Sequence, residues 1–114
     1  MHSDADHGVL RDMLRHIDLA ERFAHGHSVE SFESDELYVF AVTRCLEVIS
    51  EASRRLSKEL KARHPDSPWR QMAGAGNVYR HDYQDVVPLR VWEAVKLALP
   101  PLRAAIMQEL DAQG

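Results

Sequence analysis

Residues 34–63 read SDELYVFAVTRCLEVISEASRRLSKELKAR and decide the fold of this chain. Apolar residues recur in this stretch at steps of three and four, which places their side chains on one face of an α-helix. Those predicted to face inward are Leu37, Ala41, Cys45, Val48, Ala52, Leu56 and Leu60. Ser34 suits the N-cap, and His64-Pro65 ends the pattern because proline restricts the residue before it. Roughly 30 residues at 1.5 Å each predict a helix ~45 Å long, which would form the spine of the domain.

Upstream of this stretch, a first helix is predicted from about Val9 to Ala24. Its apolar residues fall at the same three- and four-residue steps, and they are Leu10, Met13, Leu14, Ile17, Ala20 and Ala24. The triplet His25-Gly26-His27 stops the pattern, with Gly26 near the C-cap. The residues from Ser28 to Glu33 are then expected to form a short connector.

Downstream, prolines mark two more helix starts. Ser67-Pro68 predicts a third helix, with serine as N-cap and proline at the first helical position, that extends to about Arg80. After a turn, Pro88 starts a fourth helix in the same way, with an apolar stripe made of Leu89, Trp92, Val95, Leu99, Leu102 and Ile106. Pro100-Pro101 must interrupt it, because an internal proline removes a hydrogen bond and clashes with the preceding turn. We expect a kink there, or a short fifth helix from Pro101.

The totals fit one globular domain that spans residues 1–114, with 45% hydrophobic and 28% charged residues. No strand pattern is convincing, so the expected architecture is an all-α, mostly antiparallel four-helix bundle. No apolar run reaches the ~18 residues of a membrane span, and the polar N-terminus lacks a signal-peptide core. The single cysteine, Cys45, excludes an internal disulfide and fits a cytoplasmic protein with a buried, inert thiol.

Charge and spacing limit the chemistry that this chain can perform. The formal net charge is -4, whereas proteins that grip long nucleic acids by their overall field are usually basic. Contact with RNA or a nucleotide would therefore use a local patch or a short single-stranded substrate. The histidines show no metal-ligand spacing beyond a weak His25-x-His27 pattern, for which a solvated loop is the simpler interpretation, so no metal or other cofactor is expected.

Residues 77–83 read NVYRHDY and hold the most chemically varied side chains of the sequence. His81 can take and give a proton near neutral pH, and Arg80 is a permanent cation suited to phosphate. Asn77 adds an amide, and the hydroxyl of Tyr83 could be a substrate for modification. Because a helix is predicted to end here, these groups can project into solvent or into a partner.

Helical spacing connects this segment to residues before it. At ~100° per residue, Arg70, Gly74, Asn77 and His81 form one polar stripe. Gly74 would let another backbone approach closely, which suggests a homodimer seam whose residues appear twice about a two-fold axis. The opposite side, with Trp69, Met72, Ala73, Gly76 and Tyr79, should face the bundle. Simpler interpretations remain open: Arg70 as a solvated residue, Asn77 as a cap, His81 as a helix-terminal cation and Tyr83 as a core ring.

Charged residues of the long helix could also take part. Arg44, Glu51 and Arg55 lie along one side of it and could reach the third helix. They could orient the polar stripe, although an ion pair at the edge of the interior is the simpler interpretation.

Several segments together point to a known family. They are Gly26-His27-Ser28, Ala41-Val42-Thr43-Arg44, Ser50-Glu51-Ala52, Pro68-Trp69-Arg70, Gly76-Asn77-Val78, His81-Asp82-Tyr83 and Val91-Trp92. In these segments, and over nearly its whole length, the chain resembles the HepT-like branch of the HEPN superfamily, which comprises small all-helical proteins of bacteria and archaea. The family motif is arginine, four to six residues, histidine, any residue, tyrosine. In its commonest spacing the arginine stands five residues before the histidine, where this chain has Gly76.

The resemblance implies a metal-independent ribonuclease that acts as the toxin of a toxin–antitoxin pair. Its active site would lie in a homodimer cleft and act on RNA, such as tRNA or mRNA. Carried over by position, His81 matches the catalytic histidine, and Asn77 matches an asparagine that often follows the arginine. Tyr83 matches the tyrosine to which a minimal nucleotidyltransferase antitoxin transfers AMP. Arg80 or Arg70 would have to replace the arginine that Gly76 lacks.

Two other functions stay open at this stage. Gly76 and the acidic net charge favour a dimeric partner of a nucleotidyltransferase whose degenerate cleft binds a nucleotide or RNA without cutting it. A plain structural bundle would use the polar stripe only as a dimer interface. RNA cleavage separates the first function from both of these. In the structural bundle, changes at His81 and Tyr83 would affect only stability or dimerisation.

Overall fold

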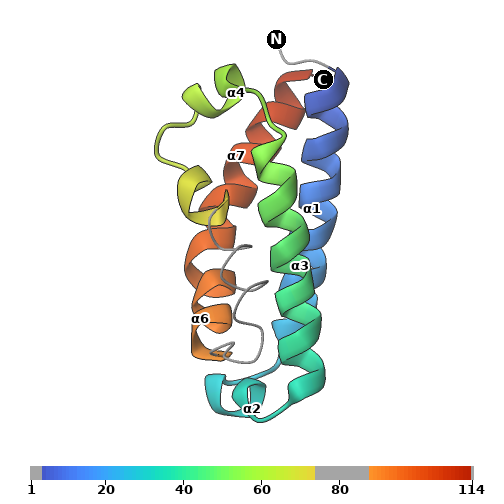
Figure 1. Ribbon diagram of the computed structural model, residues 1–114, viewed down its shortest axis with the longest axis vertical. Coiled ribbons are helices and arrows are strands. Elements are labelled where there is room, and N and C mark those ends of the chain that lie inside the picture. Colours follow the sequence, from blue (N-terminus) through green and yellow to red (C-terminus); the bar gives the residue numbers. More distant parts are fainter. Residues whose placement is uncertain (1–3, 74–87, 114) are drawn as a thin grey trace.

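The computed structural model describes residues 4–73 and 88–113, and all regular secondary structure within them is helical. Three long helical segments lie side by side in Figure 1. They are α1 (Asp4–Ala24), α3 (Glu36–Arg54), and the run of α6 (Pro88–Glu93), a π-helical turn (Ala94–Ala98) and α7 (Leu99–Gln113). The first, α1, runs antiparallel to the other two segments, so the start of α1 and the end of α7 lie at one end of the molecule. The predicted all-α helical bundle is confirmed.

The third predicted helix is described only in part. Residues 69–73 are helical, and the rest of it up to Arg80 lies outside the described residues. None of the helices that the structure describes is long and apolar enough to cross a membrane.

The first helix ends where the sequence predicts but begins earlier, at Asp4 rather than near Val9. Tertiary contact supports the extra turn, because the buried carboxylate of Asp6 accepts hydrogen bonds from the backbone and side chain of Ser57. At the other end, Gly26 has a φ of +84°, the left-handed conformation expected of a glycine that follows a helix. The backbone N–H of His27 donates to the carbonyl oxygen of Ala24 at 3.2 Å and closes the turn.

Two glycines give a matched test of this conformation. A Cβ added at either Gly8 or Gly26 would meet no atom within 4 Å, so packing does not enter the comparison. We expect Gly26→Ala to lower the free energy of unfolding by about 1 kcal/mol, because alanine is strained at a positive φ. Gly8→Ala should raise it by about 0.5–1 kcal/mol, because Gly8 lies within a helix. Urea unfolding of both variants measures the opposite signs, and equal signs would contradict the argument.

The expected connector from Ser28 to Glu33 is wrong, because Val29–Glu33 forms the short helix α2. Ser28 and Ser31 build a reciprocal capping box: Ser31 N–H donates to Ser28 Oγ at 3.1 Å, and Ser28 N–H donates to Ser31 Oγ at 3.0 Å. The helix buries Phe32, whose ring centroid lies 5.3 Å from that of Trp92. Five residues are too few to show a helical period, so the sequence pattern missed this element.

The predicted 30-residue spine is also wrong in its bounds. The helix α3 covers 19 residues, and its N-cap is Asp35 rather than Ser34, with Asp35 Oδ1 accepting from Leu37 N–H at 3.2 Å. The chain turns after Arg54 and starts a separate short helix, α4 (Lys58–Ala62). The turn forms where Ser57 N–H donates to Asp6 Oδ1 at 3.0 Å instead of to a helical carbonyl.

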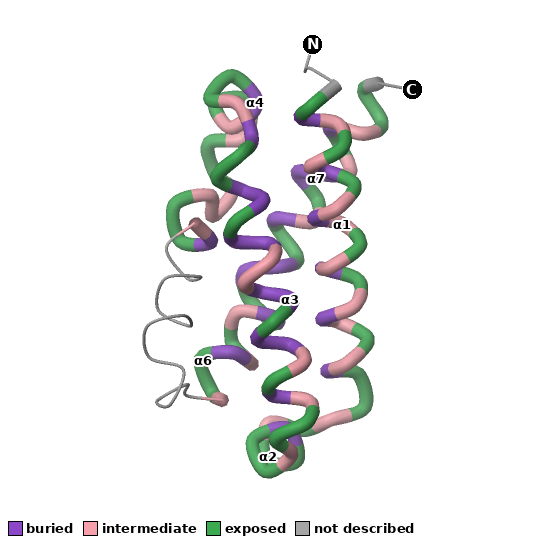
Figure 2. Tube along the Cα trace, turned by 45° about the vertical axis from the view of Figure 1, so that its right-hand side comes forward, coloured by how far each residue is buried: buried purple, intermediate pink, exposed green. Residues whose placement is uncertain are grey.

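Buried and exposed positions alternate along α3 in Figure 2. The buried residues form an inward face that is rotated from the predicted stripe. Cys45 and Ala52 are buried as expected, and so are Leu56 and Leu60 beyond the helix. Leu37 is 71% exposed, however, and Ala41 and Val48 are only half-buried. The residues of α3 that lie in the core instead are Val42, Leu46 and Ile49, which have no exposed surface. The predicted burial of the Cys45 thiol is confirmed, and burial raises its pKa, partly opposed by the charge of Arg44.

The predicted interruption at Pro100-Pro101 takes the form of a π-helical turn just before it. Leu99 N–H donates to the carbonyl oxygen of Ala94, a bond one residue longer than that of an α-helix. This turn lets two residues without an N–H enter the next helix, which begins at Leu99 and runs for 15 residues rather than as a short helix from Pro101. Of the expected apolar stripe, Leu89 is exposed and Val91 is buried instead.

Candidate functional site

The structure describes one of the five predicted site residues. Arg70 is exposed on the helical segment 69–73. Asn77, Arg80, His81 and Tyr83 lie outside the described residues, as do Gly74 and Gly76. The described part of the site is therefore the helical segment 69–73, which leads to the NVYRHDY stretch, together with the groups that hold this segment in place. We call residues 69–73 the approach.

The approach is packed as the sequence predicts. Met72 is 1% exposed and Trp69 is half-buried against the core, so the expected inward side of the third helix is confirmed at these positions. The indole N–H of Trp69 donates to the carbonyl oxygen of His64 at 2.9 Å. This bond ties the start of the segment to the turn that precedes it.

Two side chains of α3 hold the other end of the segment. Ser50 Oγ–H donates to the carbonyl oxygen of Ala73 at 3.1 Å, and Arg54 Nε–H donates to the same oxygen at 3.1 Å. Arg54 Nη2 also donates to Ser50 Oγ at 3.3 Å, so each side chain helps to hold the other in position. We call these two side chains the clamp. Ala73 is the last described residue before the motif, and this clamp holds its carbonyl group against α3.

The clamp gives a prediction for Arg54→Lys, which keeps the charge but loses the planar fork. We expect the free energy of unfolding to fall by about 1 kcal/mol, because an ammonium cannot reach both Ala73 O and Ser50 Oγ in this geometry. Arg44→Lys, at another exposed arginine of α3, is the control and should change it by less than about 0.5 kcal/mol. Urea unfolding of both measures the difference, and equal effects would exclude a role for the fork.

Three charged residues of the long helix were predicted to reach the third helix, of which the structure describes only residues 69–73. Arg44 and Glu51 are exposed and Arg55 lines a groove beside α1, and none of the three forms an ion pair with a described residue. In the described part of the third helix, the residues of α3 that make hydrogen bonds to Ala73 are Ser50 and Arg54. The available signal was their four-residue spacing, which places both side chains on the same face.

A buried carboxylate anchors the turn that precedes the approach. Glu109 of α7 is 5% exposed and accepts hydrogen bonds from Arg63 Nε at 2.8 Å and Arg63 Nη2 at 3.1 Å. His64 Nε2 lies 2.7 Å from Glu109 Oε1. The hydrogen bonds from Arg63 lower the pKa of Glu109 to about 2, against the opposing effect of burial, and His64 adds to the lowering. The same His64 accepts the Trp69 bond, so α7 and the approach are connected through one residue.

The loop histidines differ from each other. His25 is exposed, as expected of a solvated loop. His27 is half-buried instead: its Nδ1 lies 2.9 Å from Ser31 Oγ, and its ring centroid lies 4.5 Å from that of Tyr38. Within residues 4–73 and 88–113, no three histidine, cysteine or acidic side chains are grouped so that they could hold a metal ion.

Comparison with known proteins identifies the family. The family model described as ribonuclease HepT-like matches residues 13–109, which include α3, the approach and the NVYRHDY stretch. The chain belongs to the ribonuclease HepT-like family. A probable ribonuclease HepT of Thermococcus cleftensis is 37% identical to this HepT-like chain over 94 residues, or 82% of this chain and 86% of that protein.

Two further relatives extend the comparison. A protein of Methanocaldococcus jannaschii, named a putative RNase, is 33% identical and covers 82% of this chain and 78% of its own length. Another, from Caldanaerobacter subterraneus and named in the same way, is 29% identical over 91% of this chain and 93% of its own. No solved structure matches the chain significantly.

Proposed function

We propose that this HepT-like protein is a metal-independent endoribonuclease that acts as the toxin of a toxin–antitoxin pair in the cytoplasm. One observation carries the proposal: the matched region 13–109 contains a histidine and a tyrosine two residues apart, His81 and Tyr83, with Asn77 shortly before them. An imidazole can move protons at neutral pH without the help of a metal ion. The relatives that are named as RNases point to the same class of reaction.

The mechanism follows from these groups. The 2′-hydroxyl of RNA loses its proton to His81 acting as general base, and its oxygen attacks the adjacent phosphorus. The bond from phosphorus to the 5′-oxygen breaks, and that oxygen takes up a proton from water or from a protonated His81 acting as general acid, which leaves a 2′,3′-cyclic phosphate and a 5′-hydroxyl. Negative charge grows on the phosphate oxygens in between, and a guanidinium stabilises it. Asn77 adds a hydrogen-bonding group beside the phosphate.

The guanidinium must come from a residue other than position 76, which is glycine. Arg80 adjoins His81 in the sequence. Arg70 is exposed on a segment held at both ends by the Trp69 and Ala73 hydrogen bonds, so its side chain is available to a substrate. Either residue, from its own chain or from the second copy, can supply the cation.

A homodimer would bring two such sites together about a two-fold axis. Exposed apolar side chains on α3 support this assembly: Leu37 is 71% exposed and Phe40 is 59% exposed. Large apolar groups that lie close on one helix face are typical of a surface that another chain covers.

Neutralisation would act at Tyr83. A minimal nucleotidyltransferase antitoxin would transfer AMP to its hydroxyl and release pyrophosphate from ATP. The added group places bulk and negative charge two residues from His81, where it repels the phosphates of RNA.

The departure of this chain from the family motif favours a second candidate function. Gly76 stands where the family motif commonly has arginine, and the net charge of -4 disfavours binding of long RNA. A catalytically degenerate dimer would still bind a nucleotidyltransferase, a nucleotide or RNA without cutting it.

Cleavage separates the two functions. Purified protein is incubated with total RNA and with a tRNA pool in EDTA, beside the His81→Ala variant. Cutting by the parent that survives EDTA and is lost in the variant supports the ribonuclease. A folded, dimeric parent that cuts neither substrate supports the degenerate binding partner.

A further inference from the structure

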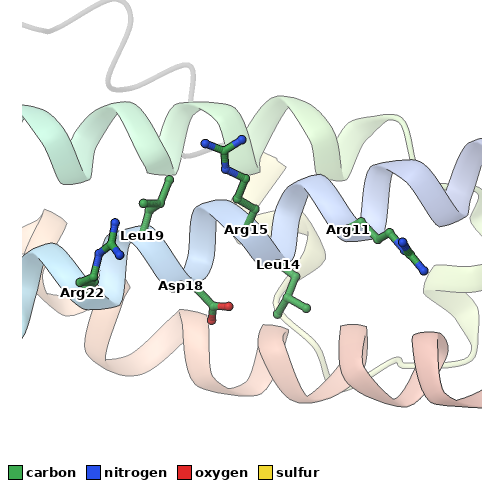
Figure 3. Close-up of a pocket in the computed structure, with 6 residues that line it drawn as sticks. All are labelled: Arg11, Leu14, Arg15, Asp18, Leu19 and Arg22. Carbon is green, nitrogen blue, oxygen red and sulfur yellow. The ribbon is translucent and has the colours of Figure 1, made fainter.

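The outer face of α1 carries two open grooves lined by arginine, and Figure 3 shows the first of them. The first has a volume of about 560 Å³, and its lining residues are Arg11, Leu14, Arg15, Asp18, Leu19 and Arg22. The second, of about 630 Å³, shares Arg11 and Arg15 with the first and adds Arg55, the C-cap residue that follows α3. We call Arg11, Arg15, Arg22 and Arg55 the arginine face.

The arginines follow a regular path along the helix. Arg11, Arg15 and Arg22 are four and seven residues apart, so they return to the same side of α1. At 1.5 Å per residue they span about 16 Å along the axis. In Figure 3 the side chains of Arg15 and Leu19 point toward α3, whereas Leu14 and Asp18 point toward α7. The row of cations therefore lies along shallow, open grooves, the first of which also has leucine side chains in its lining.

The positive charge of this face is not balanced by its neighbours. None of the four guanidinium groups forms an ion pair within the part of the chain that the structure describes. The nearby carboxylates are already engaged: Asp18 Oδ1 lies 3.1 Å from Arg103 Nε, and Glu21 Oε1 lies 3.9 Å from the same atom. Asp12 Oδ1 lies 3.6 Å from His16 Nδ1, and these two groups form an ion pair when the imidazole is protonated. Four unpaired arginines thus gather in one place on a chain whose net charge is -4.

We propose that the arginine face binds the phosphate backbone of single-stranded RNA. Guanidinium groups pair with phosphate oxygens through two parallel hydrogen bonds, and a straight row of them suits a chain of phosphates. The aliphatic side chains of Leu14 and Leu19 give the riboses and bases an apolar surface in the same groove. The choice of RNA as ligand rests on the proposed function, but the face itself lies outside the 77–83 motif. It would hold RNA on one side of the molecule while the motif acts elsewhere along the strand.

Salt-dependent binding tests this assignment. A fluorescein-labelled single-stranded RNA is titrated with the full chain, and anisotropy is read at several NaCl concentrations. Each phosphate contact contributes a salt slope of about 0.7 and, at 0.1 M salt, about a fivefold gain in affinity. The variant Arg15→Gln/Arg22→Gln should therefore bind about 25-fold more weakly, and its slope should fall by about 1.4. Lys58→Gln/Lys61→Gln, which removes two cations of α4 outside both grooves, should bind like the parent.

Three results would overturn the proposal. One is an Arg15→Gln/Arg22→Gln variant that unfolds like the parent and binds RNA with the parental affinity and slope. Another is an equal loss of binding in the Lys58→Gln/Lys61→Gln control, since net charge alone would then explain the effect. The third is displacement of RNA by poly-L-glutamate at equal charge concentration, which would assign the face to an acidic protein. Binding is also measured in the His81→Ala background, in which RNA is not expected to be cut. Loss of RNA cleavage and loss of RNA binding at the arginine face are then separate outcomes.

Discussion

Replacing His81 with alanine is expected to slow metal-independent RNA cleavage by about 10²–10⁴-fold, because the proposed mechanism assigns proton transfer to the imidazole. Initial rates are measured on a defined single-stranded RNA in EDTA, so that a contaminating metal-dependent nuclease does not contribute. The matched control is His25→Ala, which removes an exposed histidine from the loop after α1 and should leave the rate unchanged.

Further variants distinguish the roles within the motif. Tyr83→Phe should cut RNA like the parent but no longer accept AMP, because only the hydroxyl is lost. Of Arg80→Gln and Arg70→Gln, the one that slows cleavage by about 10²–10³-fold identifies the guanidinium that stabilises the phosphate. A His81→Ala variant as fast as the parent would remove His81 from the mechanism, and growth arrest by that variant would do the same in cells.

The helices could be predicted from the sequence better than their ends. The period of three and four residues located α1, α3 and the α6–α7 run because burial of one face is a local pattern. The break after Arg54 could not be predicted, because it depends on a contact between residues far apart in the sequence. Ser57 N–H donates to the carboxylate of Asp6, 51 positions away, and nothing in the sequence around Ser57 indicates this bond. The same limit applies to Leu37, which continues the apolar pattern of the sequence but is 71% exposed.

The candidate site shows a related limit. The sequence indicated that charged residues of the long helix reach the third helix, but it favoured Arg55 over Arg54. Adjacent residues differ by ~100° around a helix, so the choice depends on how packing rotates α3, and packing favours Arg54. Burial of Met72 and the half-burial of Trp69 were predictable because both belong to one apolar face. The roles of His81, Arg80, Asn77 and Tyr83 stay predictions from sequence and family.

Glu109→Gln is expected to destabilise the fold more than any other single charge removal among the described residues. The pKa of Glu109 is lowered from 4.5 to about 2, and this shift corresponds to about 3 kcal/mol of stability at neutral pH. Arg63 is 38% exposed, so solvent screening makes that figure an upper value. Urea unfolding at pH 7 should show most of this loss, and the midpoint of thermal unfolding should fall by about 10 °C. Asp111→Asn, at an exposed carboxylate on the same helix, should change stability by less than about 0.5 kcal/mol.

The stability that Glu109 contributes should depend on pH in one direction only. A carboxylate whose pKa is lower in the folded state contributes its full stability above the pKa of the unfolded chain and loses it as pH falls through the folded pKa. The difference in unfolding free energy between parent and Glu109→Gln should therefore be constant above about pH 5.5 and shrink from pH 4.5 toward 2. In a double-mutant cycle, Glu109→Gln should lower the free energy of unfolding less in the Arg63→Gln background than in the parent, because the two residues share two hydrogen bonds. A gap that widens in acid, or equal stability at pH 7, would mean that desolvation of Glu109 outweighs its pairing with Arg63 and His64.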